Sequence, residues 1–92
     1  MNETPGVWQV IIHRDPEKVL RRLPKNLVRR IWGRLRELKT NPFPADCKKL
    51  ASYENLYRLR LGDWRISYAV EEEKLIVLVL EIAPRGSAYR NL

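Results

Sequence analysis

A stripe of aliphatic residues at spacings of three and four is the strongest hydrophobic pattern in the chain, and it indicates helix. Pro24 falls inside the stripe, and proline is poorly tolerated in a helix interior, so the pattern predicts two helices at about residues 16–22 and 25–39. Asp15, Pro16 and Glu17 are typical of a helix start. The stripe consists of Leu20, Leu23, Leu27, Ile31, Leu35 and Leu38.

Alternating and β-branched runs predict strands on both sides of this helical region. The first lies at residues 7–12, and three more lie at about 55–61, 64–71 and 74–82, after a loop at 40–52 that contains Pro42 and Pro44. Residues 75–82 are apolar at almost every position, which is typical of a strand covered on both faces. The order β-α-α-β-β-β predicts an α+β fold in which the helix pair packs on an antiparallel sheet.

The most informative segment is a hairpin centred on Gly62 and Asp63, which predict a two-residue turn of type II′. This turn fixes the strand register and places Arg60 opposite Arg65. Because side chains alternate between the two faces of a strand, each face of the hairpin has its own character. The core face holds Tyr57, Leu59, Leu61, Trp64, Ile66 and Tyr68, and the opposite face holds Arg58, Arg60, Arg65 and Ser67.

Three arginines on one small face are unusual, because like charges directly opposite each other destabilise a sheet by up to about 1 kcal/mol. A bound anion would relieve the repulsion, and guanidinium groups match phosphate in a bidentate way. This face therefore indicates a phosphate-binding function. The alternative is an ordinary exposed sheet face whose charge is neutralised by Glu54 or Glu81.

Composition supports an anionic partner. The 92 residues suffice for one domain, 1–92, and residues 1–6 are expected to form a loose end. The formal net charge of +7 favours nucleic acid, an anionic membrane or an acidic protein as the partner. No leader or membrane-spanning run is visible, and the single cysteine, Cys47, forms no internal disulfide, which fits a reducing cytoplasm. The basic residues opposite the helical stripe are best interpreted as a solvated face: Arg29, Arg30, Arg36 and Lys39.

The residues available for catalysis are few. One histidine and scattered carboxylates give no metal-ligand spacing, so no cofactor is expected, and a nucleophile–base arrangement would need His13, which is more simply structural. Arginine, lysine and tyrosine remain, and these suffice for RNA cleavage. RNA carries its own nucleophile, the 2′-hydroxyl, so the protein needs only to align it, stabilise the developing charge and move protons. Arginine transfers protons poorly at neutral pH, so such a site would be slow on free RNA.

The hairpin also carries a family resemblance. Residues 57–68 (YRLRLGDWRISY), together with Leu23-Pro24-Lys25, Asn41-Pro42, Lys48-Lys49-Leu50 and the segment 85–89, resemble the RelE/ParE superfamily of type II toxins from residue 8 to residue 89. The resemblance implies the microbial-RNase-like fold of the RelE branch. It also implies metal-independent cleavage of messenger RNA in the ribosomal A site, through attack of the 2′-hydroxyl to give a 2′,3′-cyclic phosphate. An acidic antitoxin would bind and silence the toxin in the cytoplasm.

The resemblance also implies roles for individual residues. Arg60 and Arg65 would stabilise transition-state charge, Arg58 would contact phosphate or transfer a proton, Arg85 would lie near the leaving group, and Tyr89 would lie at the reacting nucleotide. Arginine stands at the strand positions where some relatives have lysine, which puts the proton-transfer assignment in doubt. The candidates for contacts with RNA or the ribosome are Lys48, Lys49 and Arg90.

Two other functions remain open. The ParE branch of the superfamily poisons DNA gyrase through a protein contact, which would not need the three arginines and Tyr89 together. A non-catalytic RNA-binding module would tolerate Arg→Lys changes that an aligned cleavage site would not.

Overall fold

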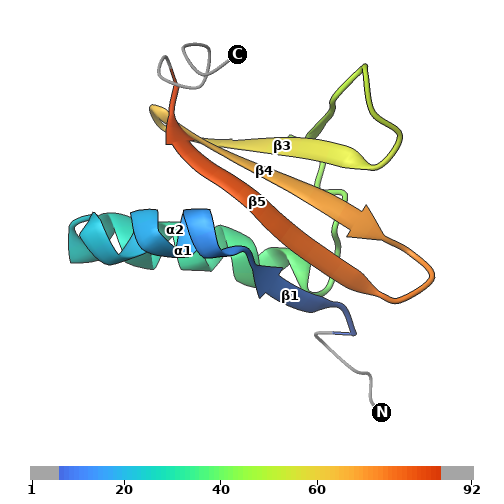
Figure 1. Cartoon of the computed structure of the whole chain (residues 1–92), viewed down its shortest axis with the longest axis horizontal. Coiled ribbons are helices and arrows are strands. Elements are labelled where there is room, and N and C mark those ends of the chain that lie inside the picture. The colour runs from blue at the N-terminus through green and yellow to red at the C-terminus, as the bar shows by residue number, and fades with distance from the viewer. Residues whose placement is uncertain (1–6, 86–92) are drawn as a thin grey trace.

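The computed structural model describes residues 7–85, and Figure 1 shows two helices lying together on one side of a twisted sheet. The strands are β1 (Gln9–Ile12), β2 (Lys48–Lys49), β3 (Leu56–Leu61), β4 (Trp64–Glu71) and β5 (Ile76–Pro84). The helices are α1 (Arg14–Arg22) and α2 (Lys25–Leu38). The two helices confirm the predicted pair and its break at Pro24. Neither helix, in this part of the chain, is long and apolar enough to cross a membrane.

Helix α1 begins slightly earlier than the sequence pattern predicts. Its N-cap is His13, whose Nδ1 accepts a hydrogen bond of 3.4 Å from the backbone N–H of Asp15. Asp15 and Pro16 therefore lie in the first turn, where a proline costs no hydrogen bond and an acidic side chain meets the positive helix end. The sequence pattern favoured Asp15 as the N-cap, but the N-cap is His13, two residues earlier.

The sheet has five strands in the order β1-β5-β4-β3-β2, and it is mixed rather than antiparallel. β3, β4 and β5 form the predicted antiparallel meander, but β1 pairs with β5 in parallel, with Val10 opposite Val77. The prediction of a wholly antiparallel sheet was wrong at this edge. After β1 the chain forms both helices and re-enters the sheet at the opposite edge, as β2. The following strands then run back across the sheet, so that the last strand, β5, pairs with the first, β1.

The strand β2 was not predicted, because two consecutive lysines carry no hydrophobic alternation. Lys48 pairs with Arg58 and Lys49 with Tyr57, so backbone pairing to β3 makes the strand. The loop before β2 covers the core face of β3 through Phe43, whose ring meets that of Tyr57 edge-on at a centroid distance of 5.1 Å.

The hairpin register is confirmed at every predicted pair, from Leu61 opposite Trp64 to Tyr57 opposite Tyr68. Gly62 has a φ of 60°, whereas Asp63 has no positive φ, as a type II′ turn requires. The side chains that form the core lie on the helix-facing side of the sheet and on the helices: Leu20, Ile31, Leu35, Leu38, Leu59, Ile66, Tyr68, Val70, Val77, Val79 and Ile82. Trp8, Trp32 and Trp64 pack against this core as half-buried neighbours.

A β-bulge interrupts the pairing of β4 with β5. Ser67 pairs with Glu81 and the next residue, Tyr68, with Val79, so Leu80 is the extra residue on β5. The alternation of β5 therefore shifts by one position, and Ile82 faces the core while Glu81 faces away from it. The expectation that β5 is covered on both faces was wrong, because the helices cover one face only. The residues of β5 on the other face stay half-buried, Leu78 among them.

Candidate functional site

The three hairpin arginines lie on the face of the sheet opposite the helices. Arg58 pairs with Ser67 and Arg60 with Arg65, so all four side chains share one face, here called the arginine face. Arg60 is exposed, and Arg58 and Arg65 are half-buried. The predicted grouping of these guanidinium groups is confirmed by the register of the strands.

Neighbouring strands extend the arginine face on both sides. Lys48 on β2 lies opposite Arg58, and Glu81 on β5 lies opposite Ser67, so four strands contribute one cross-strand row of polar side chains. The hydroxyl of Ser67 donates a hydrogen bond of 3.3 Å to Oε1 of Glu81. One end of this row is therefore cationic and the other end is a carboxylate.

Further cations gather where the hairpin turns. Nη2 of Arg65 donates a hydrogen bond of 3.1 Å to the carbonyl oxygen of Arg85, and the backbone N–H of Arg85 donates one of 2.7 Å to the carbonyl oxygen of Asp63. From α2, Nη2 of Arg30 lies 3.9 Å from the position that a Cβ on Gly62 would occupy. Arg30, expected on a solvated helix face, thus reaches the turn that carries the site.

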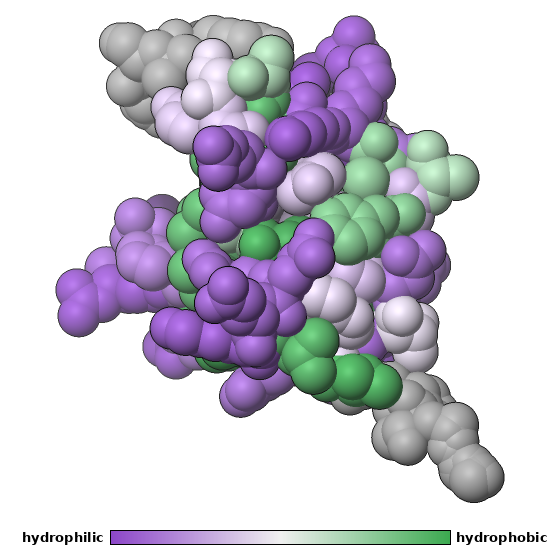
Figure 2. All heavy atoms as spheres, turned by 90° about the vertical axis from the view of Figure 1, so that its right-hand side faces the viewer, coloured by the Kyte–Doolittle hydropathy of each residue, from purple (hydrophilic) through white to green (hydrophobic). Residues whose placement is uncertain are grey.

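The opposite end of the sheet is acidic. Figure 2 faces the end that carries the β4–β5 turn, where hydrophilic side chains surround smaller hydrophobic patches. A recess beside this turn is lined by Glu54, Asn55, Val70, Glu71, Glu72, Glu73 and Lys74. Positive charge at one end and negative charge at the other would orient the protein toward a polyanion, with the arginine face leading.

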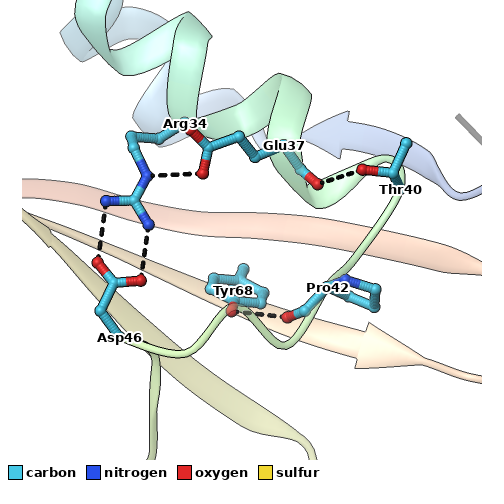
Figure 3. Close-up of polar contacts among 6 residues, drawn as sticks. All are labelled: Arg34, Glu37, Thr40, Pro42, Asp46 and Tyr68. Carbon is cyan, nitrogen blue, oxygen red and sulfur yellow. Dashed lines mark hydrogen bonds and ion pairs between the residues drawn. The ribbon is translucent and has the colours of Figure 1, made fainter. Parts of the chain in front are cut away.

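The loop before β2 is fixed by polar contacts, which Figure 3 shows. The guanidinium of Arg34 on α2 makes a bidentate pair with Asp46, at 3.0 and 2.8 Å, and its Nε lies 3.2 Å from the carboxylate of Glu37. The hydroxyl of buried Tyr68 donates a hydrogen bond of 2.8 Å to the carbonyl of Pro42. These contacts fix the loop that leads to Lys48 at the edge of the arginine face.

The ionisation of these anchors follows from their contacts. The hydrogen bond from Arg34 holds the pKa of Asp46 below its usual value, and the same bond raises the pKa of Arg34. Burial raises the pKa of the Tyr68 hydroxyl well above its ordinary value, because the charged form would lose its solvation. Tyr68 therefore stays protonated and serves as a hydrogen-bond donor.

A second basic region lies between the helices and was not predicted. Its apolar floor is formed by Leu20, Leu23, Val28 and Trp32, and its exposed rim is formed by Arg21, Lys25, Arg29 and Arg36. This helix groove includes Arg29 and Arg36, which the sequence pattern assigned to a solvated face. They are solvated, but they border apolar surface that remains open to a partner.

The remaining candidate residues are placed as follows. Lys49 lies opposite Tyr57, so its side chain points to the opposite face of the sheet from that of Lys48. The side chain of Lys49 is nevertheless exposed. Tyr89 and Arg90 lie outside the described residues. His13 caps α1, and Cys47 is half-buried. Within residues 7–85, no three His, Cys, Asp or Glu side chains are grouped in a way that could hold a metal ion.

Comparison with known proteins agrees with this geometry. Residues 10–89 match the family model described as the ParE toxin of the type II toxin–antitoxin system parDE. The chain belongs to the RelE/ParE superfamily of type II toxins. It is 33% identical over 87 residues to the RelE1 protein of Methanocaldococcus jannaschii, an alignment that covers 91% of this chain and 97% of that protein.

Solved structures of RelE proteins share this fold. The archaeal RelE–RelB complex from Pyrococcus horikoshii matches with a TM-score of 0.79 and 35% identity, over 88% of this chain and 98% of that one. A double mutant of the E. coli toxin RelE in the free state matches with a TM-score of 0.75 and 21% identity, over 89% of this chain and 87% of that one, and so shows the fold alone. The fold class predicted from the sequence is thereby confirmed, with a mixed sheet.

Sequence reasoning offered Glu81 only as one of two alternative counter-charges for the arginines, and it missed the open apolar floor between the helices. The position of Glu81 depends on the bulge beside Ser67, and bulges leave no clear pattern in a single sequence. The sequence signal for an outward-facing Glu81 was that this carboxylate interrupts the aliphatic run of residues 75–82. For the groove, the signal was Trp32 and Val28 just outside the main stripe on α2.

Proposed function

We propose that this toxin is an endoribonuclease that cuts messenger RNA in the ribosomal A site. The observation that carries the proposal is the arginine face, where Arg60 lies opposite Arg65 and Arg58 lies beside them. Stability alone would not select like charges at facing positions, whereas an RNA phosphate would neutralise them through bidentate hydrogen bonds. The whole face lies on paired strands and so holds its charges in place before substrate binds.

The chemistry follows from what these side chains can do. Arg60 and Arg65 stabilise the charge that develops on the phosphate, Arg58 contacts the phosphate, Arg85 lies near the leaving oxygen and Tyr89 stacks on the reacting nucleotide. The 2′-hydroxyl attacks the adjoining phosphorus and leaves a 2′,3′-cyclic phosphate and a 5′-hydroxyl, with no metal ion in the reaction. Lys48, Lys49 and Arg90 contact RNA or the ribosome, which supplies the alignment that a small protein lacks.

The partner that silences the toxin is an acidic antitoxin. The net charge of +7 and the existence of RelE–RelB complexes among similar structures support this part of the proposal. The helix groove fits an amphipathic helix whose apolar stripe covers the floor and whose acidic residues meet the four cations of the rim. Charge complementarity of this kind also speeds association.

The decisive experiment is induction of the chain alone in growing bacteria, followed by mapping of messenger RNA ends and of chromosomal breaks. The proposal expects growth arrest with cuts inside translated codons, and purified protein that cuts messages on programmed ribosomes. The family model carries the ParE description, which keeps gyrase poisoning as the second candidate. Arrest with gyrase-linked DNA breaks and intact messages would select that candidate, and unimpaired growth would leave an RNA-binding module.

A further inference from the structure

The chemistry on the arginine face needs one more group, which accepts the proton of the attacking 2′-hydroxyl. Guanidinium groups stay protonated at neutral pH and cannot accept it. A carboxylate is ionised at that pH and can do so. Within residues 7–85, the strand register places two carboxylates on this side of the β4–β5 pair. Glu71 lies at the acidic end, where it accepts a hydrogen bond from Asn55, whereas Glu81 on β5 lies opposite Ser67, beside the arginines.

The bulge is what brings Glu81 to this position. Val77 and Val79 face the core, so strict alternation would turn residue 81 toward the core as well. The bulge shifts the alternation, so that Ile82 fills the core position and Glu81 emerges opposite Ser67. Bulges are over-represented beside active sites, where they redirect a side chain.

The surroundings of Glu81 suit a proton acceptor. Ser67 on β4 donates its hydroxyl proton to Oε1 and orients the carboxylate. Arg65 lies two residues before Ser67 on the same face. On the helix side, a separate recess between β5 and α1 is lined in part by Glu81 and Asp15, so Asp15 is a second carboxylate near this strand. The carboxylate is half-buried, so it is both fixed by contacts and reachable by a ligand.

We propose that Glu81 is the general base of the cleavage reaction and that Ser67 is its positioning residue, an inference that rests on the proposed function. The carboxylate takes the proton of the 2′-hydroxyl as the bond from O2′ to phosphorus forms. The bond from phosphorus to O5′ breaks, and the departing O5′ takes a proton from water. Glu81 then returns its proton to solvent, so the reaction is balanced without another reagent.

The test compares Glu81→Gln, Glu81→Asp and Glu73→Gln with the wild type in single-turnover cleavage on programmed ribosomes between about pH 4 and pH 8, a range that reaches the ordinary pKa of a carboxylate. Glu81→Gln keeps the size and the contact with Ser67 but cannot accept a proton, so cleavage should fall by about 10²-fold or more. Glu81→Asp should retain part of the rate, and Glu73→Gln, at the acidic end, should cleave normally. Thermal unfolding of each variant reports the fold.

The pH profile separates a base from a mere counter-charge. A carboxylate base stops working once it is protonated, so the wild-type rate should fall toward the acidic end of the range, and Glu81→Gln should lose that limb. Ser67→Ala should lower the rate without abolishing it, because the carboxylate loses the hydroxyl that orients it. The polar and charged groups near Glu81 are Ser67 and Arg65 on β4, Arg58 on β3 and Asp15 on α1. His13, which follows β1, is a further titratable group whose effect on the pH profile needs a control. His13→Asn keeps the helix cap and should leave the limb in place.

The outcomes are distinct. If wild-type protein cleaves and Glu81→Gln cleaves equally or faster, Glu81 only balances charge, and this inference fails while the proposed function stands. If wild-type protein cleaves no message at any pH, the proposed function fails and the inference fails with it.

Discussion

The arginine face and the helix groove are both basic, but they are built in different ways. On the arginine face, paired strands hold guanidinium groups opposite one another, with Arg60 facing Arg65. In the helix groove, the cations stand at the rim of an apolar floor that includes Trp32. Guanidinium groups that face one another suit a phosphate, whereas an apolar floor gains free energy only when a partner with apolar side chains covers it. Net charge alone does not separate these two uses.

The largest effect that would sharpen this comparison is expected from Arg65→Lys. Lysine keeps the charge but loses the planar fork, so transition-state stabilisation should fall by about 3 kcal/mol, which is roughly 10²-fold in cleavage rate. Single-turnover cleavage on programmed ribosomes measures this. Antitoxin affinity should stay within about twofold, because the helix groove is untouched.

Arg29→Lys in the rim of the helix groove is the matched control for this change, and it should cleave at the wild-type rate. Thermal unfolding of both variants should match the wild type, because neither side chain belongs to the core. An Arg65→Lys variant that cleaves normally would mean that Arg65 contributes only its charge to the reaction and that the planar fork of guanidinium is not needed.

The second effect in size is expected from Arg29→Glu combined with Arg36→Glu. Two repulsive charges at the rim should weaken binding of an acidic helix by about 1.4–2.8 kcal/mol, or roughly 10- to 100-fold. Calorimetric titration with a synthetic amphipathic helix that carries acidic residues beside its apolar stripe measures the change, and Lys74→Glu at the acidic end is the control. Cleavage of messages should be unchanged. Unchanged affinity together with lost cleavage would reverse the assignment of the two regions.

The difference between the two regions also explains which of them the sequence could predict. The arginine face depends on local geometry, because a two-residue turn at Gly62 fixes every pair of the hairpin. The helices follow from one stripe and from Pro24. The pairing of β1 with β5, the bulge that turns Glu81 outward and the helix groove all depend on contacts between segments far apart in the chain. A single sequence carries only indirect signals for such contacts, such as the lone carboxylate within the aliphatic run of β5.

The smallest effect is expected from Asp46→Asn, and it tests whether Arg34 belongs to either basic region. Arg34 is a basic residue of α2, but its guanidinium is taken up by Asp46 and Glu37. Because the folded-state pKa of Asp46 is lowered, its ion pair stabilises the fold above the pKa of the unfolded state, near 4, and this stabilisation is lost as pH falls through the folded-state pKa. The Asp46 carboxylate is exposed, so the variant should lose only about 0.5 kcal/mol at pH 7.

Urea denaturation at about pH 7 and about pH 2.5 measures the free energy of unfolding of both proteins. These two pH values lie on either side of the ordinary pKa of an aspartate. The stability gap between wild type and variant should close at the lower pH, and cleavage and antitoxin affinity should both stay within about twofold at pH 7. A clear change in antitoxin affinity would mean that Arg34 contributes to the helix groove once its partner is removed. A clear change in cleavage would instead mean that the loop anchored by Asp46 controls Lys48, and with it the edge of the arginine face.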